Sequence, residues 1–269
     1  MATYLDRILS AHRAVAAQDR RDLDALVAEA SARPPTRRFE AALRGGESVA
    51  VIAEIKRRSP SRGALAPDLV ASELAGAYAS GGAAALSVLT DREFFGGSPE
   101  DLTEARDAVG IPVLRKDFTV SAADVLDARL MGADAVLLIA AALGADELAE
   151  LAALARRVGL DALVEVHDER EAETALSAKA DLIGVNQRDL YTFEVDTERA
   201  RRVAASLPTD VTTVAESGIR HGDDVRRLAD AGFSAVLVGE TLVRSEDPSA
   251  AVRDMRVART DRARRAGTA

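Results

Sequence analysis

Two scarce residue types mark candidate chemical positions in this 269-residue chain. The 35 basic residues include only three lysines, Lys56, Lys116 and Lys179, and Asn186 is the only asparagine. Of the two basic side chains, only the lysine amine readily loses its proton near neutral pH, so a lysine retained in an arginine-rich chain can act as a proton donor. Lys56, Lys116 and Asn186 each end a short apolar segment, whereas Lys179 falls in a helical pattern and is expected at the surface.

Three carboxylates occupy equivalent places, because Glu54, Glu165 and Glu216 each lie at the end of an apolar segment. Any one of these charged residues could fix a loop or form a surface ion pair of little energetic value. Several such charges that converge on one site are costly unless they serve a ligand. A lysine that faces carboxylates suits proton transfer. No metal-ligand spacing and no Ser-His-Asp combination is evident, so we expect acid–base chemistry without a metal.

The apolar segments predict eight strands separated by helices. They are mostly continuous runs, which is typical of parallel strands buried on both faces. Because alternate residues of a strand share a face, Glu54 and Lys56 should point to the same side. The predicted strands are Val49–Lys56, Ala84–Thr90, Pro112–Lys116, Ala135–Ile139, Ala162–Val166, Leu182–Asn186, Thr212–Glu216 and Ala235–Gly239.

Glycines recur just before three of these strands, at Gly81-Gly82, Gly132 and Gly232, where a helix should end. About eight βα units repeat along the chain, and their simplest closure is an α/β fold of the (β/α)8 TIM-barrel type. An open doubly wound sheet is the alternative, disfavoured because no G-x-G-x-x-G follows the first strand. In the barrel, the carboxyl ends of all strands meet at one face, so the candidate residues should converge there.

Small residues after the last two strands predict a phosphate site. Ser217-Gly218 and Gly239-Glu240 follow the seventh and eighth strands, the loops from which barrels often build such a site. The N-termini of the adjacent helices would add favourable partial charge. The segment 59–63, which begins with Ser59, could complete the pocket or form a lid.

We expect a single domain over residues 1–269. Residues 1–48 should form a helical extension, 49–250 the barrel, and 251–269 a C-terminal helix and tail. On that last helix, a basic stripe is expected to be a solvated face, favourable near a helix C-terminus. The stripe consists of Arg253, Arg256, Arg259 and Arg262.

Composition excludes several classes of protein. A net charge of −9 argues against nucleic acid as a partner. No run of about 18 apolar residues exists, so no membrane span is expected. The chain has no cysteine, which rules out disulfides and thiol chemistry. Asp6 and Arg7 interrupt any signal-peptide pattern, so a cytoplasmic location is expected. The assembly stays open, with a monomer as one option.

Six segments together resemble the indole-3-glycerol phosphate synthase family in order and spacing. The resemblance extends over residues 49–250, and the helical N-terminal extension also suits that family. The segments are Ala53–Ser61, Ala84–Asp91, Leu114–Phe118, Leu163–His167, Gly184–Leu190 and Glu216–Ile219.

The resemblance implies a carbon–carbon lyase (carboxy-lyase) of tryptophan biosynthesis. Its substrate would be 1-(2-carboxyphenylamino)-1-deoxyribulose 5-phosphate, and its products indole-3-glycerol phosphate, carbon dioxide and water, without any cofactor. By matching motif, Lys116 would be the general acid, Glu165 the general base, and Lys56 a neighbour of the substrate carboxylate. Glu54 and Asn186 would position these groups and the substrate hydroxyls.

The remaining family positions would bind substrate or support the catalytic residues. Glu216 would support the network, and Arg188 and Phe118 would shape the mouth and the anthranilate pocket, with Leu237 among the substrate-binding residues. The phosphate would be held through the backbone of four residues, helped by the Ser59 side chain. Those four are Ser217, Gly218, Gly239 and Glu240.

The chain departs from the usual family pattern at four places, none of them a proposed proton donor or acceptor. They are Gln187, Ala215, the Ser121-Ala122-Ala123 run and the Val70-Ala71 pair. Two other functions stay open: another phosphate-binding barrel such as phosphoribosylanthranilate isomerase, or a non-catalytic barrel that binds a phosphorylated metabolite. The first is expected to use a different acid–base pair, often cysteine or aspartate, and this chain lacks cysteine. The second would not need Lys116 and Glu165 together.

Overall fold

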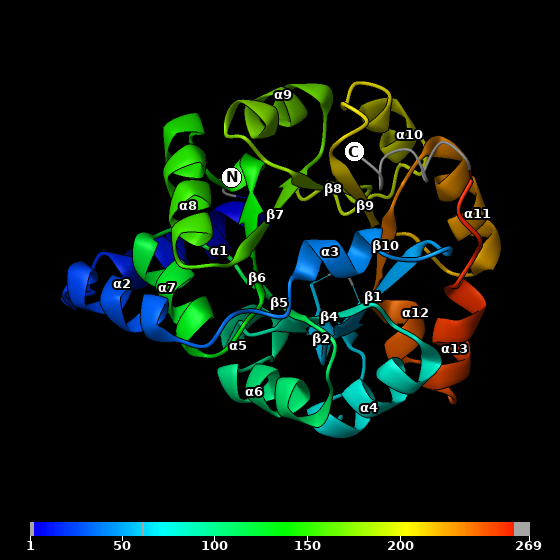
Figure 1. Cartoon of the computed structure of the whole chain (residues 1–269), viewed down its shortest axis with the longest axis horizontal. Helices are drawn as coiled ribbons and strands as arrows, with labels where there is room; N and C mark the ends of the chain where they lie inside the picture. Colours follow the sequence, from blue (N-terminus) through cyan, green and yellow to red (C-terminus); the bar gives the residue numbers. More distant parts are fainter. Residues whose placement is uncertain (1–2, 61, 261–269) are drawn as a thin grey trace.

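Eight parallel strands close into a barrel in the computed structural model, which describes residues 3–60 and 62–260 (Figure 1). The order around the barrel is β1-β10-β9-β8-β7-β6-β5-β4. The eight predicted strands are confirmed, each boundary to within one residue. The strands are β1 Ala50–Ile55, β4 Ala85–Leu89, β5 Val113–Lys116, β6 Ala135–Ile139, β7 Asp161–Val166, β8 Leu182–Asn186, β9 Thr212–Glu216 and β10 Ala235–Val238.

Helices surround the barrel in the alternating order that the sequence predicts (Figure 1). A short antiparallel pair, β2 Arg58–Ser59 with β3 Gly63–Ala64, follows β1. The outer helices are α4 Ala71–Gly81, α6 Pro99–Ala108, α7 Ala122–Leu130, α8 Ala145–Arg157, α9 Glu169–Ser177, α10 Arg199–Ala204, α11 Gly222–Ala231 and α13 Pro248–Met255. Shorter turns are α5 Arg92–Phe95, η1 Ala140–Ala142 and α12 Glu240–Val243.

The predicted helix ends follow from local backbone chemistry. Gly82, Gly132 and Gly232 have φ values of +88°, +93° and +99°, a left-handed conformation that glycine adopts without a Cβ clash. At the start of α7, the Ser121 hydroxyl accepts a hydrogen bond from the backbone N–H of Asp124 at 3.2 Å. This departure from the family pattern therefore still supplies an N-cap.

The barrel strands are buried on both faces and separate two apolar layers. Outward side chains pack against the helices, and inward side chains such as Ile52, Leu114 and Leu163 fill the barrel. The interior is closed at one end by α3 Phe39–Arg44, whose Phe39 and Leu43 are fully buried in the inner layer. The opposite end, where the strands finish, is therefore the end available to a ligand.

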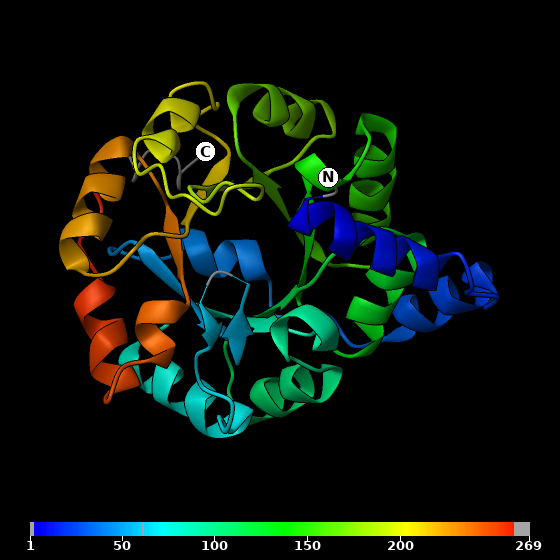
Figure 2. The ribbon, with the colours of Figure 1, turned by 180° about the vertical axis from the view of Figure 1, so that it is seen from behind.

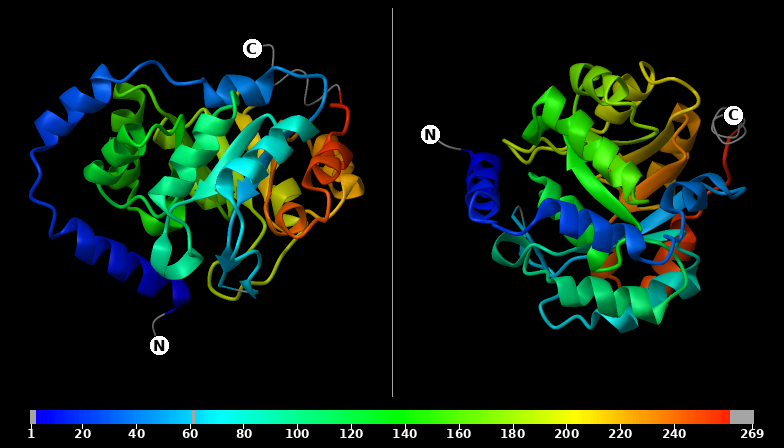
Figure 3. Two further views of the ribbon diagram at one scale, coloured as in Figure 1. Left: turned by 90° about the horizontal axis from the view of Figure 1, so that it is seen from below. Right: turned by 60° about the vertical axis from the view of Figure 1, so that its left-hand side comes forward.

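The N-terminal extension is helical, as predicted, and runs along the barrel from one end to the other (Figure 3). Helix α1 Tyr4–Ala16 lies at the carboxyl ends of the strands, helix α2 Leu23–Ala32 packs against α7, and α3 closes the far end (Figures 2 and 3). The Tyr4 ring meets Phe94 and Phe193 edge-on, at centroid distances of 5.9 and 5.6 Å. The extension therefore reaches the loops at the ligand-accessible end.

Two expectations about surface residues are wrong in part. The arginine stripe does not share one helix, because α13 ends at Met255. Arg259 is 5% exposed and donates to the backbone carbonyls of Leu43, Arg44 and Ser234, so it ties the chain end to α3 and the barrel. Arg262 lies outside the described residues.

Lys179 is exposed, as expected, but it lies in the turn after α9 rather than on a helix. Its φ of +59° places it in the left-handed region at the helix end. Among the described residues, no helix has both the length and the apolar character needed to cross a membrane.

Candidate active site

Strand alternation places the charged residues inside the barrel at its open end. Leu114, Leu163 and Val214 are buried in the inner layer. Each is followed two residues later by a charged residue on the same face: Lys116, Glu165 and Glu216. The same alternation in β1 takes Ile52 to Glu54. The apolar interior therefore ends in a ring of ionisable groups.

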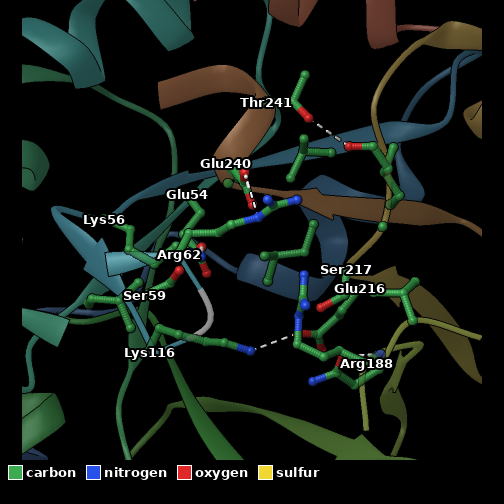
Figure 4. Close-up of a pocket in the computed structure, with 18 of the residues that line it drawn as sticks. Glu54, Lys56, Ser59, Arg62, Lys116, Arg188, Glu216, Ser217, Glu240 and Thr241 are labelled. Carbon is green, nitrogen blue, oxygen red and sulfur yellow. Dashed lines mark hydrogen bonds and ion pairs between the residues drawn. The ribbon is translucent and has the colours of Figure 1, made fainter. Parts of the chain in front are cut away.

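Lys116 lies between two buried carboxylates, those of Glu165 and Glu216, of which Figure 4 labels Glu216. Its Nζ is 2.8 Å from Oε2 of Glu165 and 2.6 Å from Oε2 of Glu216. The side chain of Lys116 is 14% exposed, and those of the two glutamates are 3% and 2% exposed. One ammonium group is thus shared by two carboxylates with little access to water.

These contacts push the three pKa values in different directions. Burial opposes the charge on Lys116, but the carboxylates of Glu165, Glu216 and Glu54 together raise its pKa above the usual value. Burial also opposes the charge on Glu165, yet Lys116, His167 and Asn186 lower the pKa to about 2. For Glu216, burial and the neighbouring carboxylates outweigh the ammonium and raise the pKa to about 7. The same ammonium therefore leaves one carboxyl more acidic and the other less acidic than usual.

Glycines make room for the carboxylates. A Cβ at residue 184 would collide with Oε1 of Glu216, and a Cβ at residue 239 would collide with Oε1 of Glu54. Glu54 is 4% exposed and forms an ion pair with Lys56, which directly follows β1 and points to the same side. The predicted orientation of this pair is confirmed. The close packing also gives Gly239 a role that does not depend on a phosphate.

Asn186 fixes the second oxygen of Glu165. Its Nδ2 donates to Oε1 of Glu165 at 3.0 Å, and its Oδ1 accepts from the backbone N–H of Arg188 at 3.0 Å. The Arg188 guanidinium donates to the carbonyl of Phe193 at 2.9 Å. The amide thus couples the orientation of the carboxylate to the loop that follows β8.

The structure brings all the candidate residues into one cavity of about 1040 Å³ at the open end of the barrel. Most of the catalytic candidates lie on the barrel strands, whereas Lys56 directly follows β1; among the binding candidates, Leu237 lies on β10 and Ser59 on β2. Figure 4 shows Lys116 and Glu216 in this cavity, together with Arg188, Ser217 and Glu240. The lining includes Glu54, Lys56, Ser59, Lys116, Phe118, Glu165, Asn186, Arg188, Glu216, Ser217, Gly218, Leu237, Gly239 and Glu240.

The side of the cavity assigned to phosphate has an unusual backbone. Ser217 and Gly218 have φ values of +68° and +75°, and Gln187 donates to the Ser217 carbonyl at 2.7 Å. A left-handed serine is strained, and such strain is common at ligand sites. The Ser59 hydroxyl is buried without a hydrogen-bond partner among the described residues.

Glu240 would contribute its backbone rather than its side chain. Its carboxylate forms ion pairs with Arg62 and Arg244, each at 3.4 Å. The adjacent helix α12 is a single turn, so the expected contribution from helix N-termini is smaller here than a full helix would give.

Comparison with known proteins identifies the family. The family description "Indole-3-glycerol phosphate synthase" matches residues 5–255. The chain belongs to the indole-3-glycerol phosphate synthase family. It is 52% identical to indole-3-glycerol phosphate synthase 2 of Streptomyces coelicolor, over 84% of this chain and 87% of that one. It is 51% identical to the enzyme of Mycolicibacterium smegmatis, over 96% of both chains.

Solved structures agree on the fold alone. A thiamine phosphate pyrophosphorylase from Pyrococcus furiosus superimposes with a TM-score of 0.59 at 20% identity, over 80% of this chain and 95% of that one. At that identity the similarity shows a shared barrel and says nothing of the reaction. The fold predicted from the sequence is confirmed.

Sequence reasoning missed the residues that fix the strand end carrying Lys116 and that dock α1 beside it. Asp117 accepts hydrogen bonds from Thr90 and from Arg115, the latter at 2.9 Å, and so fixes the strand end that carries Lys116. His12 of α1 bonds Asp91 at 2.8 Å and lies 3.9 Å from Asp117. The sequence signal was that Arg115 and Asp117 flank Lys116, a pattern that by itself is equally compatible with a surface ion pair.

His12, Asp91 and Asp117 are close enough together to suggest a metal site. The contacts favour a different role, because Asp117 already accepts from Arg115 and Thr90. The His12–Asp91 pair instead docks α1 on the rim of the cavity.

Proposed function

We propose that this chain is an indole-3-glycerol phosphate synthase, a carboxy-lyase that acts on 1-(2-carboxyphenylamino)-1-deoxyribulose 5-phosphate. It closes the pyrrole ring, releases carbon dioxide and eliminates water. The family membership supports this reaction. The observation that carries the mechanism is the buried Lys116 between Glu165 and Glu216.

Ring closure needs a proton donor, because attack of the aromatic carbon on the ketone places negative charge on the ketone oxygen. Lys116 is the donor, held as an ammonium by the two carboxylates. Proton transfer by a positioned group is worth roughly 10²–10⁴-fold in rate. Loss of carbon dioxide then restores the aromatic ring, with Lys56 beside the departing carboxylate.

Dehydration needs a base and a proton for the leaving hydroxyl. Glu165 removes the proton from the carbon next to the ring nitrogen, as its low pKa keeps it ionised. Asn186 keeps its carboxylate oriented, and Glu216, with a pKa of about 7, can hold a proton within reach of Lys116. The phosphate is held at Ser217, Gly218, Gly239 and Glu240, with the free hydroxyl of Ser59 on the facing loop.

A direct assay tests the proposal: the deoxyribulose phosphate substrate is added and indole fluorescence is followed. A folded sample without signal would favour another phosphate-binding barrel or a non-catalytic binding protein. In the same assay Lys116→Arg should lose most of its kcat while substrate binding survives, because a guanidinium keeps the charge but does not release a proton. Near-normal turnover in that variant would remove Lys116 from the acid role.

We also propose that the protein works as a cytoplasmic monomer on a phosphorylated small molecule, without nucleic acid or membrane as a partner. The acidic net charge of −9 supports the exclusion of nucleic acid. Light scattering at assay concentrations measures the assembly, and a mass of twice 28.4 kDa would overturn the monomer.

A further inference from the structure

A line of three titratable groups leads away from the catalytic cluster. Oε1 of Glu165 lies 3.6 Å from Nε2 of His167, and Nδ1 of His167 lies 3.0 Å from Oε2 of Glu171. His167 immediately follows β7, and Glu171 is in the first turn of α9. A side-chain adjustment of about 0.5 Å would bring the first pair to hydrogen-bond distance.

Packing alone does not explain the imidazole. The His167 side chain is 11% exposed, and its Nε2 has no hydrogen-bond partner among the described residues. A buried ring nitrogen without a hydrogen-bond partner is costly, so its presence calls for a functional explanation. Glu171 is held in place, because its Oε2 also accepts from the backbone N–H of His167 at 2.7 Å.

The outer end of this line reaches water by a route separate from the cavity. The Glu171 side chain is 23% exposed, and neither Glu171 nor His167 lines the cavity. Lys116 and Glu165 are nearly inaccessible even without substrate, and a substrate in the cavity would cover them further. A proton could therefore still enter through Glu171 when the mouth is filled.

The proposed reaction consumes such a proton. The substrate loses an ionised carboxylate as neutral carbon dioxide, so one proton must be taken up to balance the charge. In steps, the ketone oxygen gains one proton, the leaving hydroxyl gains a second, and the carbon next to nitrogen loses one. Glu165 can return the last of these to Lys116, 2.8 Å away, which leaves a deficit of one proton per turnover.

We infer that His167 and Glu171 form a proton path that recharges the Glu165–Lys116 pair from solvent. Glu171 supplies a proton to Nδ1 of His167 as Nε2 releases one to Oε1 of Glu165. The hydrogen bond from Asn186 to Oε1 breaks as the protonated carboxyl group rotates, and the rotation presents that proton to the neutral amine of Lys116. His167 is a positioning and relay residue that acts through Glu165, and this inference rests on the proposed function.

The charges around His167 suit a group that gains and loses a proton near neutral pH. Burial lowers the pKa of His167, but Glu171 and Glu165 outweigh burial and raise it above the usual value. Arg199, from α10, is the cationic group that acts against them. Histidine is the side chain whose ordinary pKa is nearest to working pH, so the raised value keeps it within reach.

The test compares His167→Gln, His167→Ala and Glu171→Gln with the wild type. Glutamine fills much of the space but does not ionise, so kcat should fall about tenfold near pH 8 with KM unchanged. Glu171→Gln should lower kcat in the same direction. Glu173→Gln is the matched control, since Glu173 is an exposed carboxylate on the same helix and should keep wild-type kcat.

Rescue separates a relay from a packing role. Added imidazole should restore turnover of His167→Ala in proportion to the imidazolium concentration, at fixed pH and ionic strength, and should leave the wild type unchanged. Wild-type kcat and pH profile in both His167 variants would overturn the path, and so would a loss that imidazole does not restore. A wild-type protein that fails to turn over the substrate would instead contradict the proposed function.

Discussion

Removal of the ammonium group from the catalytic cluster should destabilise the protein in a pH-dependent way. In Lys116→Met, Glu165 and Glu216 lose their shared counter-ion while both stay almost fully buried. Removal of one partner of a buried ion pair costs about 3–5 kcal/mol, because a charge is left without compensation. The two carboxyls can avoid that cost by binding protons.

The pH dependence follows from those protons. A carboxyl that stays protonated in the folded state, against an unfolded pKa of about 4.3, costs about 1.4 kcal/mol for each pH unit above that value. Between about pH 5.5 and 8, two such carboxyls lower the free energy of unfolding by about 7 kcal/mol. In the wild type, Glu216 is the only one of these two carboxyls whose pKa is raised, to about 7. Its cost in folding stability therefore grows by about 2 kcal/mol between pH 5.5 and 7 and does not grow further above pH 7.

The variant should therefore lose about 3–5 kcal/mol relative to the wild type as the pH rises across that range, with relaxation of the site reducing the difference. For a domain of this size that corresponds to a fall of about 10 °C in Tm. Melting curves of both proteins at several pH values measure it. Lys179→Met is the matched control, because the same side chain is exchanged at an exposed turn and Tm should stay within about 2 °C.

A Tm difference between Lys116→Met and the wild type that does not change with pH would refute the reasoning. So would a loss no larger than that of the control. Either result would mean that water reaches the two carboxylates in solution and that the shared ammonium does not hold them.

Three further changes test the support of the site. Gly184→Ala should place a Cβ against Glu216 and cut kcat about tenfold or more. The control is Gly76→Ala, at a helix position with open space, which should retain kcat and stabilise the protein by about 1 kcal/mol. Equal kcat values in the two variants would contradict the prediction. In the folded protein the pKa of His12 is raised, so its ion pair with Asp91 stabilises the docking of α1 below about pH 6.5 and weakens as the pH rises through the folded pKa. His12→Ala should therefore speed amide exchange in α1, with the smallest effect at high pH. An effect that does not change with pH would count against this prediction. Arg259→Ala leaves the buried carbonyl of Leu43 without its donor, while the carbonyls of Arg44 and Ser234 keep the N–H groups of Gly46 and Ala50. It should cost about 1–3 kcal/mol in urea unfolding, and a loss under about 0.5 kcal/mol would be inconsistent.

The strands and their chemical residues could be predicted because both depend on local patterns. Continuous apolar runs mark strands buried on both faces, and the period of two decides which residues point inward. Asn186 was therefore placed correctly at the end of β8, and Glu165 lies one residue before the end of β7. The helix ends at Gly82 and Gly232 were equally readable, since a left-handed residue after a helix favours glycine.

The misses share one cause, which is contact between distant parts of the chain. Arg259 reads as part of a solvated stripe, yet it contacts carbonyls more than 200 residues away in α3. His12 reads as an isolated histidine until α1 brings it to Asp91, 79 residues further on. Neither pairing leaves a mark in local composition.

From the amino-acid order alone came the kind of chemistry: which residues could give or take a proton, and on which face of each strand they would stand. The strength of each acid and base was decided only when the barrel closed. Closure buried Glu165 and Glu216 around a single ammonium, and it divided their pKa values in opposite directions. The reason is that charge–charge energies depend on separation and on exclusion of water, and both are properties of the folded barrel.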